Sequence, residues 1–169
     1  MGKNNVVDAI GRIIAVGGSL RKIMFNGNTT CPKPEKDPAV AATVQRMLKG
    51  SADAEVVFGT PRISGKDSTS MERSYISTKD GEKKTVKAKS ELLMSALGVA
   101  EDSSSMTTPD FKLPGDIVYV VGETKDELGA SEFYEMHNVT GRNVPKSDCN
   151  KVRQTYEHLE AAIKDDIVH

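Results

Sequence analysis

Residues 64–68 place a hydroxyl, a glycine, a cation, a carboxylate and a second hydroxyl at consecutive positions. Glycine lets a backbone approach a ligand closely. Lysine supplies a point charge for phosphate, aspartate offers oxygen to Mg²⁺, and serine donates to phosphate oxygens. These residue types are typical of a nucleotide or phosphate site. They are also ordinary turn residues, so a polar surface turn is the competing interpretation.

A Walker A loop is excluded at this position. That loop needs glycine, four residues, and then Gly-Lys-Ser/Thr. Here five residues separate Gly59 from Gly65, Pro61 lies between them, and Asp67 stands where the metal-binding hydroxyl belongs. Because proline also removes a backbone donor, this stretch cannot form the phosphate nest of a P-loop.

The composition narrows the class of protein. The chain has 169 residues, a net charge of −1, no tryptophan and few other aromatic residues. These values argue against nucleic acid and anionic membranes as partners. No apolar run approaches the length of a membrane span, and no signal peptide is recognisable, so a cytoplasmic location is expected. Cys31 and Cys149 are single and far apart, which favours reduced thiols.

Hydrophobic spacing before the central motif predicts two helices. Residues 6–16 carry apolar side chains at helical spacing, and Asp37-Pro38 begins a second helix that runs to about Phe58. Residues 20–25 read as a strand, and residues 26–34 as a loop rich in amides and prolines. A short extended run at residues 61–63 is expected to end at Gly65.

The second half of the chain alternates strands and polar loops. Asp80-Gly81 predicts a hairpin within residues 75–89, whose lysines are interpreted as solvated rather than as a basic binding patch. Further expectations are a buried strand at 92–99, a Ser/Thr loop at 102–109, a strand covered on both faces at 117–121, a polar loop at 124–132, and a last helix starting at Asp148 or Asn150. The pattern predicts a mixed α+β domain and the beginning of a second, with a boundary before Leu113.

Two stretches resemble one enzyme family. Residues 64–71, SGKDSTSM, resemble the GKDSMSM-type stretch of phosphoribosylformylglycinamidine synthase. Residues 115–133, GDIVYVVGETKDELGASEF, resemble that family's GDxxYxxGxTxxELGGSEYY strand and loop. The opening helix and the asparagine-rich stretch into Pro32-Lys33-Pro34 match more weakly. The order and spacing fit the second half of the enzyme.

The resemblance implies an aminoimidazole ribonucleotide (AIR) synthetase-like fold. Residues 1–112 would form its N-terminal domain, and residues 113–169 the truncated start of its C-terminal domain. The family's sequence continues beyond the stretch that matches residues 166–169. The chain is therefore expected to be a fragment of a larger polypeptide, without synthase activity of its own.

The family's chemistry implies roles for residues of the central motif. The family is an ATP-dependent carbon–nitrogen ligase of purine biosynthesis, which phosphorylates the amide oxygen of formylglycinamide ribonucleotide and displaces the phosphate with ammonia from glutamine. Phosphate and Mg²⁺ positioning dominates such catalysis. The implied nucleotide or phosphate-binding residues are Gly65, Lys66, Ser68, Asn26 and Asn28, and Asp67 is expected to orient Lys66 or hold Mg²⁺.

Several positions depart from the family pattern. Ala130 replaces a glycine and would oppose a positive φ, and Phe133 replaces a tyrosine and loses its hydroxyl. The family's catalytic histidine belongs to the first half of the enzyme. None of the histidines and cysteines of this chain matches the family's catalytic groups; they are His137, His158, His169, Cys31 and Cys149. No catalytic residue is therefore expected here.

The expected partners are the remaining half of the same enzyme, a glutaminase domain or subunit, the small-molecule substrate, and a second copy in a homodimer. Two alternatives stay open. This half could be structural and hold a nucleotide without turnover, or the chain could be another ATP-dependent member of the AIR synthetase superfamily, such as a kinase or selenophosphate-type enzyme. The loop at residues 127–132 argues against the last.

Overall fold

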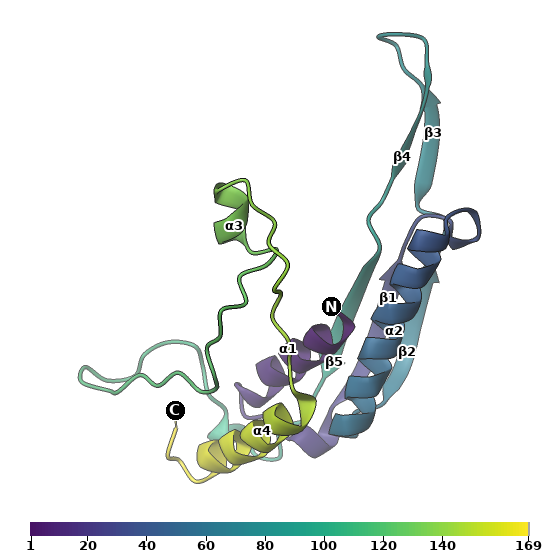
Figure 1. Ribbon diagram of the computed structural model, residues 1–169. Helices are drawn as coiled ribbons and strands as arrows, with labels where there is room; N and C mark the ends of the chain where they lie inside the picture. The colour runs from purple at the N-terminus through teal and green to yellow at the C-terminus, as the bar shows by residue number, and fades with distance from the viewer. Residues whose placement is uncertain (169) are drawn as a thin grey trace.

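The computed structural model describes residues 1–168 and confirms a mixed α+β fold (Figure 1). The helices are α1 (Gly2–Ile14), α2 (Pro38–Phe58), α3 (Glu132–Met136) and α4 (Cys149–Lys164). The strands are β1 (Met24–Thr30), β2 (Arg62–Ser68), β3 (Glu72–Ile76), β4 (Lys83–Lys87) and β5 (Glu91–Leu97). Short 3₁₀ turns lie at Leu20–Lys22, Pro34–Lys36 and Ser103–Ser105.

A three-stranded sheet in the order β2-β1-β5 holds the core together. β1 runs parallel to β2, with α2 as the crossover between them, and antiparallel to β5. Helices α1 and α2 pack on one face of this sheet. Buried members of the core are Val6, Ile10, Ile14, Phe25, Ala54 and Phe58. The central motif lies on β2, an outer strand of this sheet that its backbone pairing with β1 holds in place.

Both ends of α2 follow from the sequence. The Asp37 carboxylate accepts a hydrogen bond from the Ala39 amide at 3.0 Å, and Pro38 occupies the first turn, where its missing N–H costs nothing. At the other end Gly59 adopts a left-handed φ of 69°, a conformation that favours glycine. The predicted helix from residue 38 to about residue 58 is confirmed.

The strand boundaries around the motif differ from the prediction. Residues 20–22 form a 3₁₀ turn, and the strand begins at Met24 and runs to Thr30, through most of the predicted loop. β2 likewise continues through Gly65 to Ser68. The cause is tertiary: β1 finds hydrogen-bonding neighbours on both sides, which outweighs the weak strand propensity of asparagine and glycine.

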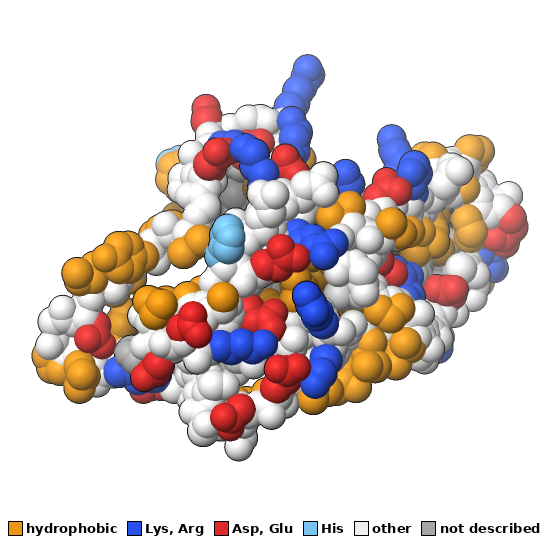
Figure 2. Space-filling model, turned by 90° about the horizontal axis from the view of Figure 1, so that it is seen from below, with side chains coloured by type: hydrophobic (Ala, Val, Ile, Leu, Met, Phe, Trp, Pro, Cys, Tyr) orange, Lys and Arg blue, Asp and Glu red, His pale blue; other side chains and the backbone are white. Residues whose placement is uncertain are grey.

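The strand predicted at 92–99 is confirmed as β5, although only one of its faces is buried, whereas the strand predicted at 117–121 is wrong. In β5, Leu92 is 6% exposed whereas its neighbour Leu93 is 63% exposed, so only one face of the strand is covered. Residues 117–121 form no strand and their side chains are exposed. A strand needs a hydrogen-bonded neighbour, and the pairings within residues 1–168 give this segment none. Figure 2 shows hydrophobic side chains gathered on this projecting loop, at the left of the view.

The predicted hairpin is confirmed as β3 and β4, which pair antiparallel from Glu72 opposite Lys87 to Ile76 opposite Lys83. It projects away from the rest of the chain (Figure 1). The polar loop expected up to residue 132 ends where α3 begins. The Ser131 hydroxyl caps that helix by accepting from the Tyr134 amide at 3.2 Å.

Helix α4 packs against the first part of the chain. Its N-cap is Asp148, one of the two starting residues that the sequence predicted. The Tyr156 hydroxyl donates to the Val7 carbonyl at 3.0 Å, and the Glu160 carboxylate accepts from the Leu20 amide at 2.9 Å. Burial opposes ionisation of Glu160, but the bonds from Leu20, Lys164 and Ser19 outweigh it and lower the pKa. None of the helices within residues 1–168 is long and apolar enough to cross a membrane.

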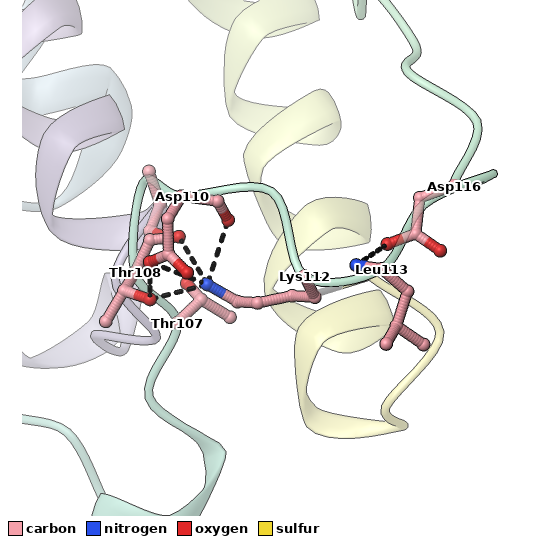
Figure 3. Close-up of polar contacts among 7 residues, drawn as sticks. Thr107, Thr108, Asp110, Lys112, Leu113 and Asp116 are labelled. Carbon is pink, nitrogen blue, oxygen red and sulfur yellow. Dashed lines mark hydrogen bonds and ion pairs between the residues drawn. The ribbon is translucent and has the colours of Figure 1, made fainter.

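A compact polar turn follows the 3₁₀ turn at residues 103–105 (Figure 3). The Lys112 ammonium donates to the Asp110 and Thr108 carbonyls at 2.9 and 3.2 Å and lies 3.0 Å from the Asp110 carboxylate. The Leu113 amide donates to Asp116 at 2.9 Å. This turn fixes the direction of the chain as it leaves the first part.

The pKa of the Asp110 carboxyl reports whether this turn is formed. Hydrogen bonds from Thr108 and Lys112 lower the pKa of Asp110 from 3.8 to about 2. Because the folded pKa is depressed, this contribution to stability is present above pH 3.8 and is lost as the pH falls toward 2. We expect a carboxyl titration by ¹³C NMR to give a midpoint near 2, and Thr108→Val to raise it. An unchanged midpoint in that variant would contradict the arrangement.

Candidate functional site

The strand register collects polar side chains on one face of the sheet. Alternate residues of a strand point to opposite faces. Phe25, Gly27 and Thr29 of β1 are buried toward the helices, so the residues between them face away. We call that surface the open face. Its rows across β2, β1 and β5 are Ser64, Asn26 and Ser95; Lys66, Asn28 and Leu93; and Ser68, Thr30 and Glu91.

Lys66 and Ser68 lie together on the open face. The Lys66 ammonium donates to the Ser68 hydroxyl at 2.7 Å, and the lysine is exposed. Within residues 1–168, Lys66 makes no ion pair. A cation without a carboxylate partner, beside a hydroxyl, has the chemistry for binding an anionic oxygen. These two predicted residues are brought together.

Gly65 has a structural role as well as a predicted one. A Cβ at this position would lie 2.6 Å from the Gly27 carbonyl oxygen, closer than a carbon can approach. The pairing of Gly65 with Gly27 thus requires glycine in β2. Close approach of a ligand to the Gly65 backbone stays a prediction.

Asp67 lies on the opposite face from Lys66 by strand alternation. Burial, followed by the negative charges of Asp67 and Glu35, raises the pKa of the Cys31 thiol, which places the carboxylate on the Cys31 side. Within residues 1–168, no group of three His, Cys, Asp or Glu side chains is arranged to hold a metal ion. The structure therefore does not bring Asp67 to Lys66.

Asn26 and Asn28 both lie on the open face, but they differ in burial. Asn26 is exposed, whereas the Asn28 side-chain oxygen is buried and has no hydrogen-bond partner. A buried acceptor without a donor costs about 1–3 kcal/mol. Asn28 occupies the middle row of the open face, between Lys66 and Leu93.

Sequence reasoning missed a supporting cluster beneath the site. The Arg62 guanidinium donates to the Ser51 hydroxyl at 2.6 Å and forms an ion pair with Glu55, joining β2 to α2. The Ser51 hydroxyl donates to Glu55 at 2.6 Å. Arg62 also lies where a side chain on Gly27 would be. The i, i+4 spacing of Ser51 and Glu55 is the signal that was available in the sequence.

Sequence reasoning also missed Ser64 and Ser95, which flank Asn26 on the open face. Ser64 belongs to the central motif, but Ser95 lies 31 positions later and meets Asn26 only through strand pairing. The signal available in the sequence was a single small polar residue, Ser95, within an otherwise apolar run.

The loop that resembles ELGGSEY requires a left-handed residue. Ala130 has a φ of 58°, so the replacement of glycine opposes the local backbone, as anticipated. We expect Ala130→Gly to relieve about 1 kcal/mol and slow exchange of the Gly129 amide, which bonds Asn143 at 2.8 Å, about fivefold. Hydrogen-exchange NMR measures this, with Ala130→Ser as the matched control. Equal rates in all three proteins would argue against strain at this residue.

The other flagged side chains lie away from the open face. His137 packs edge-on against Phe133 with ring centroids 4.9 Å apart, and His158 is exposed on α4. Cys31 and Cys149 are free and buried, and burial raises the pKa of both thiols. His169 lies outside the described residues. None of the described four is placed for chemistry at the candidate site.

The mixed α+β fold of the described residues fits a domain of the AIR synthetase-like type, and the relatives support that class. No family model matches the chain. It is 31% identical over 159 residues to the phosphoribosylformylglycinamidine synthase subunit PurL of Thermococcus sibiricus, covering 94% of this chain and 20% of the relative. The PurL subunit of Methanocaldococcus jannaschii is 30% identical over 169 residues, covering 98% and 22%.

A third PurL subunit, from Symbiobacterium thermophilum, is 29% identical over 168 residues, covering 96% of this chain and 19% of the relative. These similarities confirm the predicted relationship to the phosphoribosylformylglycinamidine synthase family over nearly the whole chain. The chain spans about a fifth of the length of these relatives.

Proposed function

We propose that this chain supplies a phosphate-binding surface to a phosphoribosylformylglycinamidine synthase, an ATP- and glutamine-dependent ligase of purine biosynthesis. The observation that carries the proposal is the β1–β2 register, which sets Lys66, Ser68, Asn26 and Asn28 on one face, with no ion pair to Lys66 within residues 1–168. The similarity to PurL subunits supports the choice of reaction.

The residues of the open face suit the phosphate part of ATP or of the ribonucleotide substrate. Lys66 supplies the charge, and Ser68 supplies a hydroxyl that can donate to phosphate oxygen. When bound, ATP supplies the phosphoryl group that activates the substrate amide. Asp67, the residue that the resemblance implies for Mg²⁺, lies on the Cys31 side of the sheet, and Glu91 is the carboxylate among the open-face residues defined above.

We propose the domain division and partners that the family implies. Residues 1–112 correspond to the N-terminal AIR synthetase-like domain, and residues 113–169 to part of the C-terminal one. Ile63, Leu93 and Leu97 are each about 60% exposed on the sheet, a surface that the remaining half of the enzyme or a second copy would cover. A glutaminase domain or subunit supplies ammonia in the cytoplasm. The chain alone is expected to show no synthase turnover.

A structural half that binds nucleotide without turnover is the second candidate. The observation that favours it is the position of the described histidines and cysteines, all of which lie away from the open face. Binding without hydrolysis would distinguish this role. The third candidate, another ATP-dependent superfamily member, is disfavoured by the similarity to PurL subunits.

Calorimetric titration tests the proposed phosphate site. We expect the chain to bind ADP and ATP, and Lys66→Ala to weaken binding at least tenfold, because the variant removes the one cation among the open-face residues defined above. Lys79→Ala is the matched control, since Lys79 lies at the distal turn of the hairpin. Equal affinity of the Lys66→Ala variant and the unmodified chain would contradict the proposal.

A further inference from the structure

We infer that two copies of this chain associate by strand exchange, in which residues 117–121 of one copy pair with the free edge of β4 in the other. Two segments that project from the rest of the chain make this contact: the hairpin β3–β4 and the loop that contains residues 117–121 (Figure 1). The contact uses neither the open face nor the proposed phosphate site, so it stands or falls independently of them.

Residues 117–121 have the composition of a strand but no strand beside them. All five are β-branched or aromatic, the residue types that are enriched in sheets. Their exposed fractions run from 64% at Val121 to 86% at Val120. Within residues 1–168, no strand pairs with them. Joining the edge of a sheet would pair their backbone groups and remove apolar side chains from water.

The hairpin offers such an edge. Within residues 1–168, β4 pairs only with β3, and each of its five residues is exposed. An isolated two-stranded hairpin is marginally stable in water, and a third strand stabilises it. Val86 of β4 is 60% exposed, so a neighbouring strand also gives this side chain an apolar contact. The five residues of β4 match the five residues of the unpaired run in length.

Charge selects this pair of segments over the alternatives. β4 has a lysine at each end, Lys83 and Lys87, whereas the run at 117–121 has a carboxylate just outside each end, Asp116 and Glu123. Opposite charges on neighbouring strands stabilise a sheet, and like charges destabilise it. The mixed pair is therefore favoured over pairing of two β4 strands and over pairing of two copies of the run.

The geometry requires a second copy. Figure 1 shows the hairpin at the upper right of the view and the loop at the left, so the two segments of one chain do not meet. Residues 72–87 contain five cationic side chains and three carboxylates, whereas residues 116–127 contain four carboxylates and one lysine. Each copy carries one segment of each kind. The exchange can therefore be made twice, which closes a symmetric dimer.

The mass of the full chain, measured by analytical ultracentrifugation over a range of concentrations, tests the inference. We expect a dimer that one of the variants Tyr119→Pro and Val120→Pro weakens at least tenfold. Successive amides of a strand point to opposite sides, so one of these two donates to β4, and proline removes that donor. Val120→Thr is the matched control. It keeps the amide and a β-branched side chain, so it should change the dissociation constant less than threefold.

Charge reversal provides a second readout. Lys83→Glu should weaken the dimer about fivefold, because it places a carboxylate beside those that flank the added strand. Arg46→Glu makes the same change of charge on the exposed side of α2 and should leave the dimer unchanged. In hydrogen-exchange NMR, amides of residues 117–121 should exchange more slowly as the concentration rises.

Two results would overturn the inference. One is a chain that stays monomeric at every concentration, and the other is a dimer that both proline variants leave unchanged. If Leu93→Ser weakens such a dimer and the proline variants do not, the copies associate through the open face, where Leu93 is 63% exposed. Because Tyr119 and Val120 are 77% and 86% exposed, the proline variants leave the core intact.

Discussion

Gly65→Ala is expected to destabilise the fold by about 3 kcal/mol, at the upper end of the cost of overpacking. The added Cβ would lie 2.6 Å from the Gly27 carbonyl oxygen, and that oxygen belongs to a backbone held by strands on both sides. It cannot move without breaking the β1–β2 pairing. The loss should appear as a lower midpoint in urea unfolding followed by circular dichroism.

Gly50→Ala is the matched control for this prediction. Gly50 lies within α2, and a Cβ there meets the Lys3 amide at an ordinary 3.5 Å. Because alanine is the better helix former, we expect this variant to gain about 0.5–1 kcal/mol. If the free energy of unfolding of the Gly65→Ala variant lies within about 0.5 kcal/mol of that of the unmodified chain, β2 does not run through residue 65 as described.

Arg62→Ala is expected to cost about 3 kcal/mol, the lower end for breaking a buried ion pair. The variant leaves the Glu55 carboxylate, 12% exposed, without its cation and removes a donor from fully buried Ser51. It also opens space beside Gly27 under the open face. Replacing both charges, in Arg62→Met with Glu55→Leu, should recover about 1–2 kcal/mol because no charge stays buried.

An exposed ion pair on the same helix provides the comparison. Lys49 and Asp53 lie 3.0 Å apart with side chains 73% and 47% exposed. Lys49→Ala should therefore change the free energy of unfolding by less than about 0.5 kcal/mol. Similar losses for Arg62→Ala and Lys49→Ala would show that the pair beneath the sheet is no more buried than a surface one.

The helices were predictable because their signals are local. Asp37-Pro38 and Gly59 mark the ends of α2 through capping chemistry, and Asp80-Gly81 fixes the hairpin turn. β1 was not predictable in this way. Asn26 to Thr30 have loop-like composition, and they form a central strand only because β2 and β5 pair with them. The run at 117–121 shows the converse, a strong strand signal without a neighbour.

The candidate site was predictable in part. The consecutive residues of the motif identified Lys66 and Ser68, and the resemblance pointed to Asn26 and Asn28. Strand alternation then separates Asp67 from Lys66, a distinction that requires the knowledge that residue 65 lies inside a strand. Ser95 lies at the site because of the sheet register, and Arg62 because β2 packs against α2. Both are properties of the folded chain and cannot be seen in the sequence.

The most direct test of the account is the location of bound nucleotide on the folded chain. Amide shifts in an NMR titration with ADP should be largest for Asn26, Lys66 and Ser95, on the three strands of the open face. Residues of the hairpin tip should not shift. Shifts confined to α1 and α2, or to the loop at 127–140, would contradict the claim that the open face is the phosphate-binding surface.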